Sequence, residues 1–163
     1  YRLKEKLPKN LSDIRTPIGI CEITKKGNDI TLVTYGSTWR IVMAAAKQLD
    51  NIGINAEVID VQSLLPFDLK NTISKSIKKT NKIAFIDEDV PGGTTAYMMQ
   101  KVLEDQNAYR FLDSKPISIS AKAHRPAYGD DGDYFSKPNI EDVFDIVYEL
   151  MHEYNPTQFP KLY

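Results

Sequence analysis

The chain has 163 residues, of which 42% are apolar and 26% are charged, and its formal net charge at pH 7 is -1. This size and composition are typical of a soluble globular domain with one core, and they exclude disordered and fibrous classes. The near-neutral charge excludes the clustered basic side chains of a nucleic-acid-binding protein, and no stretch is long and apolar enough to be a membrane-spanning helix.

The N-terminal part predicts a linker followed by two strands. Residues 1–17 are polar and contain two prolines, so we expect an extended segment that leads from an upstream domain into a folded domain at 18–154. Two β-rich runs follow at 18–24 and 30–35, and the connection between them contains glycine, asparagine and aspartate. This turn chemistry predicts that the two strands pair as an antiparallel hairpin.

The next part of the chain alternates helix and strand. Apolar residues recur at helical spacing across 38–51, and Gly53 is placed to end that helix. A strand is predicted at 55–61, and the sequence Pro66-Phe67-Asp68 is typical of the start of a second helix. The helical face of this second helix carries Leu69, Ile73 and Ile77.

The C-terminal half continues the alternation. A short apolar strand is predicted at 82–87, a helix from Thr94, and a last strand at 117–123. Asn139 is a favourable cap for a final helix that runs to about residue 154. The two prolines within 155–163 predict an extended C-terminal tail.

The strands are apolar runs separated by helices, which is typical of parallel sheets covered on both faces. We therefore predict an α/β fold with three layers. It contains a mostly parallel sheet of about five strands, with one antiparallel edge strand and helices on both faces.

Acidic residues follow one of the predicted strands. The run Asp87-Glu88-Asp89 lies at the end of a strand, where ligands of open α/β sheets gather, so it suits a metal ion or a phosphoryl group. A phosphoacceptor domain also needs an acid at the end of the first parallel strand, where this chain has Thr34-Tyr35-Gly36. We therefore favour a solvated surface or a partner contact for the three acids, and a structural tight turn at Gly36.

Few residues are suited to catalysis or metal binding. His124 follows the last strand beside Lys122, but a lone histidine without a placed partner favours a structural role. The acidic stretch 130–133 lacks the ligand spacing of a calcium loop and predicts an exposed loop. His152 lies near a helix C-terminus, where the helix dipole favours a cation. The single Cys21 cannot form an internal disulfide, so we expect a cytoplasmic protein.

Three segments together closely resemble a known family. They are DITLVTYG at 29–36, EVIDVQSLLPFD at 57–68 and IDEDVPGG at 86–93. They are similar to the transketolase C-terminal domain in β-subunits of thiamine-diphosphate-dependent 2-oxo acid dehydrogenases (E1 components). The resemblance covers about residues 16–154, and the tail is similar to bacterial forms in which the α and β parts are fused.

The resemblance implies a parent enzyme that oxidatively decarboxylates a 2-oxo acid, either pyruvate or the branched-chain 2-oxoisovalerate. That enzyme would pass the acyl group to the lipoyl arm of the acyltransferase component, E2. Thiamine diphosphate and magnesium sit between other domains of such enzymes. The resemblance therefore implies no catalytic, cofactor-binding or metal-binding residue in this chain, and we expect the isolated domain to be inactive.

The resemblance also implies partners. Such domains help E1 subunits assemble, and in several relatives they dock the peripheral-subunit-binding domain of E2. Because those E2 domains present basic residues, our candidates for docking are the acidic side chains of the last helix. They are Glu141, Asp142, Asp145 and Glu149.

Two alternatives stay open. One is the C-terminal domain of another transketolase-family enzyme, since these share the fold. The other is a free-standing flavodoxin-like signalling or nucleotide-binding module in which Asp87 and Lys122 form the active pair. The chain also departs from the family pattern, with Ala123 in place of the usual aspartate and Tyr97 in place of a usual acid.

Overall fold

The structure is a computed structural model that describes residues 4–126, 128–129 and 131–162. One five-stranded sheet has the order β1-β3-β2-β4-β5. The three inner strands and β5 are parallel, and β1 pairs antiparallel with β3 at one edge. The predicted fold class is therefore confirmed. The strands are β1 (Glu22–Lys25), β2 (Ile30–Thr34), β3 (Ala56–Asp60), β4 (Ile83–Ile86) and β5 (Ile117–Ile119).

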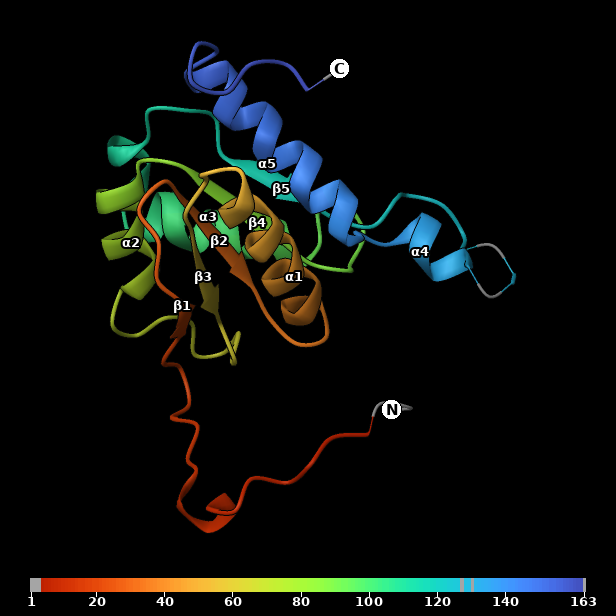
Figure 1. The fold of residues 1–163 in the computed structure, drawn as a ribbon. Helices are drawn as coiled ribbons and strands as arrows, with labels where there is room; N and C mark the ends of the chain where they lie inside the picture. The colour runs from red at the N-terminus through yellow and green to blue at the C-terminus, as the bar shows by residue number, and fades with distance from the viewer. Residues whose placement is uncertain (1–3, 127, 130, 163) are drawn as a thin grey trace.

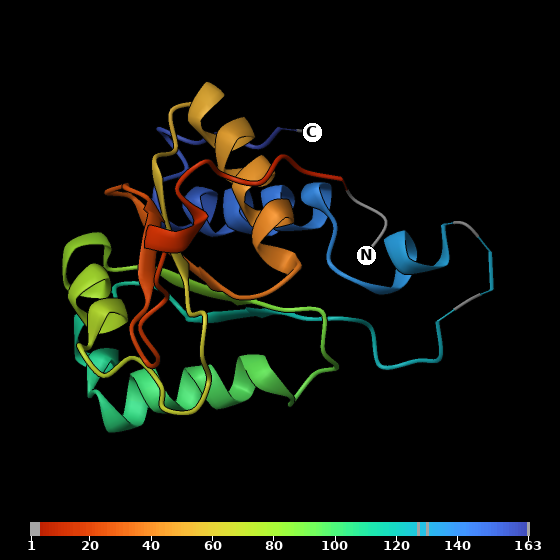
Figure 2. The ribbon, with the colours of Figure 1, turned by 90° about the horizontal axis from the view of Figure 1, so that it is seen from below.

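Helices cover both faces of the sheet, as Figure 2 shows in a view from below. Side chains alternate across a strand, so neighbouring residues of β2 enter different cores. Leu32 packs in the core with α1 and α5, whereas Val33 packs in the core with α2 and α3. The helices are α1 (Thr38–Asn51), α2 (Thr72–Thr80), α3 (Thr94–Gln100), α4 (Gly132–Ser136) and α5 (Ile140–Tyr154).

Short helical turns complete the element list. A π-helical turn (Lys101–Asp105) directly continues α3, and a 3-10 turn (Ala108–Phe111) follows it. Another 3-10 turn (Leu11–Asp13) interrupts the otherwise extended N-terminal segment. The segment loops out below the sheet in Figure 1 and returns toward α1, where Glu5 forms an ion pair with Arg40. Within the residues that the structure describes, none of the helices is long and apolar enough to cross a membrane.

The predicted hairpin is wrong, although β1 is the antiparallel edge strand. All five residues of β2 are buried, because β2 lies between β3 and β4 and has no free side for β1. A Cβ on Gly27 would overlap the backbone of Ala56 and Glu57, so this glycine permits a close passage of the connection across β3. The connection therefore crosses over β3 to reach β2.

The second helix starts later than predicted. Asp68 and Asn71 have φ values of 37° and 51°, in the left-handed region, so the chain cannot be helical from Pro66 onward. The buried carboxylate of Asp68 accepts the N–H groups of Thr72 and Ile73 at 2.8 and 2.9 Å, which satisfies two free donors of the first turn of α2. Asp68 therefore caps the helix rather than belonging to it.

The C-terminal elements also differ from prediction. β5 ends at Ile119 rather than at 123, and the stretch expected to be a loop at 130–133 contains the start of α4. Asp130 itself lies outside the described residues. The Asn139 cap of α5 is confirmed, with a reciprocal pair of hydrogen bonds to Asp142.

The tail is not extended. It turns after α5, and Phe159 is only 5% exposed in the core beside α5. The Tyr148 hydroxyl donates to the Pro160 carbonyl at 2.6 Å, and Nδ1 of His152 lies 2.7 Å from the Phe159 carbonyl. The prolines stop the helix, but the aromatic side chain brings the backbone back onto α5.

Candidate docking and assembly surfaces

The acids at the end of β4 are held by the chain itself. Asp87 is 3% exposed, and its carboxylate accepts the Asp89 N–H at 3.2 Å and lies 3.5 Å from the Tyr35 hydroxyl. Burial raises the pKa of Asp87 above its ordinary value, although backbone N–H groups act against this effect. Asp89 accepts the N–H of Thr94 at the start of α3. Both carboxylates therefore stabilise the strand end.

The structure does not bring Lys122 to Asp87. The ammonium of Lys122 lies 3.6 Å from the centre of the Phe135 ring, and no ion pair joins it to Asp87 among the described residues. His124 is exposed and its Nδ1 lies 3.0 Å from the neighbouring Arg125 carbonyl. The arrangement lacks the buried acid-lysine pair that a phosphoacceptor site would need.

The described residues do not form a preformed protein cage for a metal ion. Magnesium usually keeps several waters and takes one or two carboxylates together with phosphate oxygens of its ligand. Within the described ranges, no group of three His, Cys, Asp or Glu side chains gathers in a way that could hold a metal ion. Tyr35 also bridges the ends of β2 and β4, since its hydroxyl lies near Asp87 and 3.4 Å from Thr94.

Three of the four acidic candidates on α5 form an exposed row. Glu141, Asp145 and Glu149 are spaced four residues apart, so they lie on one face of the helix, and all three are exposed. The fourth, Asp142, is half-buried and accepts the Asn139 N–H at 3.1 Å, so its charge is used in the helix cap. We call Glu141, Asp145 and Glu149 the acidic row.

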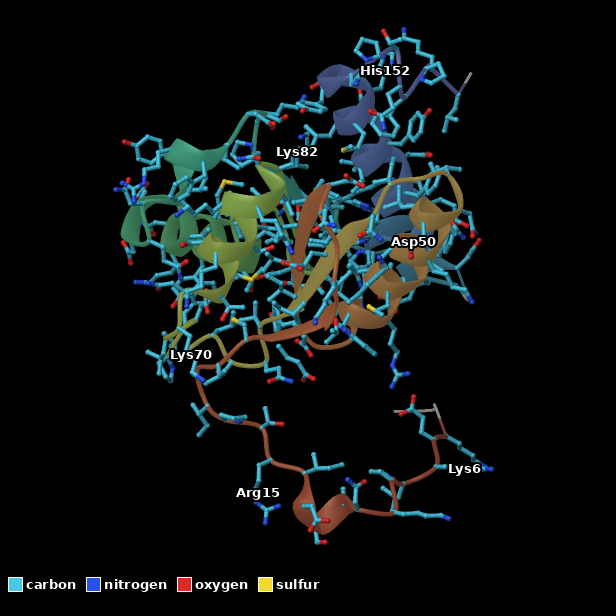
Figure 3. The ribbon with its side chains drawn as sticks, turned by 60° about the vertical axis from the view of Figure 1, so that its left-hand side comes forward. Lys6, Arg15, Asp50, Lys70, Lys82 and His152 are labelled. Carbon is cyan, nitrogen blue, oxygen red and sulfur yellow. The ribbon has the colours of Figure 1, made fainter. Side chains whose placement is uncertain are left out.

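A hollow lies beside the acidic row. Its volume is about 300 Å³. Asp145, Ile146 and Glu149 of α5 line it on one side, and Leu162 of the returning tail lines it on the other. His152 also lines it, and Figure 3 shows His152 where the last helix meets the tail. The folded-back tail also contributes Lys161, so the hollow combines apolar side chains with charged groups of both signs. A mixture of apolar and polar side chains is typical of docking sites.

A second surface, which the sequence interpretation missed, is apolar. Ile18, Leu65 and Leu69 are 73%, 80% and 63% exposed, and they come from two loops that are locked together. The Gly19 N–H donates to Ser63 Oγ at 2.6 Å, and the Leu69 N–H donates to the Gly19 carbonyl at 2.8 Å. We call Ile18, Leu65 and Leu69 the apolar patch. Figure 3 places the neighbouring Lys70 where the N-terminal segment joins the body.

Tyr97, one of the departures from the family pattern, supports the loop of the apolar patch. Its hydroxyl donates to the Leu64 carbonyl at 3.0 Å, and its ring packs edge-on against Phe67 with ring centres 5.8 Å apart. The tyrosine therefore ties α3 to the 64–69 loop. A signal for the patch was present in the sequence as consecutive leucines beside proline, where a surface loop would carry polar residues.

The structure is an open, doubly wound α/β domain. The acidic side chains at the end of β4 are occupied by hydrogen bonds from the chain itself. The family "Transketolase, C-terminal domain" matches residues 19–133. The chain belongs to this family.

Several curated relatives are named as β-subunits of the pyruvate dehydrogenase E1 component. The chain is 32% identical over 151 residues to the pyruvate dehydrogenase E1 component subunit beta of Mesostigma viride, covering 93% of the chain and 45% of the relative. It is 32% identical over 148 residues to the corresponding subunit of Rhizobium meliloti, which covers 90% of the chain and 31% of that relative. The identity to the chloroplastic subunit beta-2 of Arabidopsis thaliana is 37% over 123 residues, covering 75% and 29%. The chain thus spans less than half of these relatives.

Solved structures show the same fold. A structure described as a split gene transketolase, inactive beta4 tetramer, has a TM-score of 0.67 at 23% identity and covers 85% of this chain and 44% of its own. A transketolase of Pichia stipitis has a TM-score of 0.57 at 15% identity, and the match covers 89% of this chain and 20% of the transketolase. At these identities the likeness concerns the fold alone.

Proposed function

We propose that this chain acts as the C-terminal assembly domain of a pyruvate dehydrogenase E1 component. The observation that carries the proposal is the family match together with 32% identity to pyruvate dehydrogenase β-subunits over 93% and 90% of the chain. The parent enzyme would oxidatively decarboxylate pyruvate and pass the acetyl group to lipoyl-E2. We prefer pyruvate to 2-oxoisovalerate because these relatives are named for pyruvate.

The cofactor belongs to other parts of the parent enzyme in this proposal. The chain's own acids cap helices or line its surface, so they offer no convergent ligand set within the described residues. Isothermal titration with thiamine diphosphate and magnesium should show no saturable binding to the protein. Tight, magnesium-dependent binding would overturn this part of the proposal.

The apolar patch is the proposed contact with the remaining E1 domains or subunits. Large exposed apolar side chains that adjoin one another typically mark association surfaces, and here hydrogen bonds hold their loops in place. Leu65→Glu with Leu69→Glu should abolish association with an E1 whose β-chain is truncated before its own C-terminal domain. Ile52→Glu is the matched control, since Ile52 is 41% exposed on a different surface. Equal loss in both variants would contradict the assignment.

The acidic row is the proposed docking site for the peripheral-subunit-binding domain of E2. Exposed charges mainly set the encounter rate of a complex, so neutralisation should act chiefly on association. We expect the triple variant Glu141→Gln, Asp145→Asn, Glu149→Gln to slow association about tenfold at low salt, with a smaller effect at high salt. A Glu104→Gln control removes an exposed acid from another surface. Unchanged association of the triple variant would remove the acidic row from the proposal.

The compartment is proposed to be the cytoplasm. The buried, free thiol of Cys21 suits a reducing environment. Cell fractionation tests this assignment, and recovery of the protein from an organelle, as the name of the Arabidopsis relative suggests for that protein, would overturn it.

A further inference from the structure

The strand β5 leaves one edge of the sheet open. It pairs with β4, and the order of the described sheet places no strand on its other side. The Ile119 carbonyl and the Ala121 N–H are both used on the β4 side, at 3.0 and 2.9 Å. Because N–H and C=O groups of alternate residues face opposite sides of a strand, those of Ser118 and Ser120 face outward.

A hollow lies along this outward edge. Its volume is about 300 Å³, and both Ser118 and Ser120 line it. At one end the Lys122 N–H donates to the Ser136 carbonyl at 2.9 Å, so the end of α4 closes the groove there. The opposite wall comes from the first part of α5, which contributes Asp142 and Ile146. The groove thus has the shape of a slot beside an unpaired strand.

One residue of the slot lining, Ser136, carries a buried polar atom. Ser136 is 2% exposed, and its hydroxyl has no hydrogen-bond partner among the described residues. Buried hydroxyl groups are normally paired, because leaving one unpaired costs its desolvation without compensation. The slot therefore combines free backbone donors and acceptors of a strand with an unsatisfied side-chain hydroxyl.

The charges around the slot do not favour a small anion. The ammonium of Lys137 lies 3.1 Å from the Glu88 carboxylate, and the Asp142 carboxylate contributes a negative charge to the same lining. The ammonium of Lys122 lies over the Phe135 ring. A ligand rich in alternating neutral donors and acceptors matches this lining better than a phosphate or sulfate.

We propose that the outward edge of β5 binds an extended peptide segment of a partner protein. The segment would add a further strand through hydrogen bonds to the backbone of Ser118 and Ser120. A polar group of the segment would pair with the Ser136 hydroxyl. The outward edge of β5 differs from the acidic row and the apolar patch, although Ile146 of α5 lines both the slot and the hollow beside the acidic row. Its role does not depend on the parent reaction.

The experiment measures amide hydrogen exchange by NMR on the labelled protein with a probe peptide. The probe has seven residues, alternates threonine and valine, and ends in glutamate. Saturating probe should slow exchange of the Ser118 and Ser120 amides about tenfold or more, since each becomes hydrogen-bonded. Unchanged exchange at both amides, or protection confined to another surface, would overturn the proposal.

Variants at one position separate a backbone role from a side-chain role. Ser118→Pro removes the outward N–H and leaves the bonds to β4 intact, because proline is tolerated where the N–H of an edge strand faces solvent. It should weaken probe binding about tenfold, whereas the matched Ser118→Ala keeps the N–H and should bind normally. Equal binding by the two variants would contradict strand addition.

Two further measurements guard against loss of folding in the proline variant. A probe methylated on the backbone nitrogens of one edge should fail to bind the unaltered protein, and a probe methylated on the other edge should bind. Ser136→Ala should weaken the unmethylated probe, because it removes the hydroxyl that the probe would satisfy. Binding of both methylated probes would refute the proposal without any change in the protein.

Discussion

Gly19 offers a test of how the apolar patch is built, because another glycine provides an internal control. Gly19 and Gly53 have similar φ values of 78° and 82°, in the left-handed region. A Cβ at Gly19 would lie 2.8 Å from Pro66 Cγ and 2.9 Å from Leu69 Cδ1, whereas nothing lies within 4 Å of a Cβ at Gly53. Alanine at either site meets the same backbone penalty, but only Gly19→Ala meets a steric one.

The magnitudes follow from these contacts. A left-handed conformation costs an alanine roughly 1–2 kcal/mol, which is the whole expected effect of Gly53→Ala. Overpacking adds about 1–2 kcal/mol at Gly19, because exposed Leu69 can move aside but the Pro66 ring is rigid. We therefore expect Gly19→Ala to destabilise the protein by about 2–4 kcal/mol in total.

Urea unfolding followed by the fluorescence of the single Trp39 measures both variants against the unaltered protein. The difference between the two variants isolates the contact of the 18–20 loop with the 63–69 loop. Equal free energies of unfolding for Gly19→Ala and Gly53→Ala would refute the tight junction that supports the apolar patch.

Three more predictions concern buried groups. Burial raises the pKa of Asp87, so between about pH 4 and that raised pKa the native state binds more protons than the unfolded state, and the free energy of unfolding falls as pH rises. Asp87→Asn should flatten this pH dependence in urea unfolding. Parallel pH profiles for the variant and the unaltered protein would contradict the buried carboxylate. Burial alone would raise the pKa of Glu57, but hydrogen bonds, among them those from Lys79 and Ser76, outweigh burial, and the pKa is lowered. The stability that Glu57 contributes is therefore present above its unfolded pKa and is lost as pH falls through the lowered pKa. Lys79→Met should therefore lower the free energy of unfolding by about 2 kcal/mol at pH 7, which is less than for a fully buried pair because Lys79 is partly exposed. A loss of stability that does not shrink in acid would contradict the ion pair between Lys79 and Glu57. Phe159→Ala should cost about 3 kcal/mol in thermal or urea unfolding, and a neutral result would show that the tail is not packed on α5.

The sequence predicts the fold class well because it depends on apolar runs and their spacing. The buried strands β2, β3 and β4 and the faces of α1 and α5 are all visible in that pattern. The order in which the strands pair cannot be predicted from the same pattern. A Gly-Asn-Asp connection suits either a hairpin or a crossover, and only the two-sided burial of β2 excludes β1 as its neighbour.

Local backbone features explain the other differences. The left-handed conformations of Asp68 and Asn71 delay α2, and no periodicity of apolar residues reveals them. Phe159 packs the tail against the core through a long-range contact, and the two prolines from which an extended tail is predicted give no sign of it. The acidic row is visible in the sequence as acids at i, i+4 spacing. The fourth candidate, Asp142, does not share this spacing, and its charge is used in the helix cap.

The most direct test of the assembly role is analytical ultracentrifugation of the protein mixed with a pyruvate dehydrogenase E1 whose β-chain is truncated before its own C-terminal domain. We predict a complex that contains both components and that is lost with Leu65→Glu and Leu69→Glu but retained with Ile52→Glu. Separate sedimentation of the unaltered protein and the truncated E1, at concentrations where complete E1 is assembled, would contradict the account.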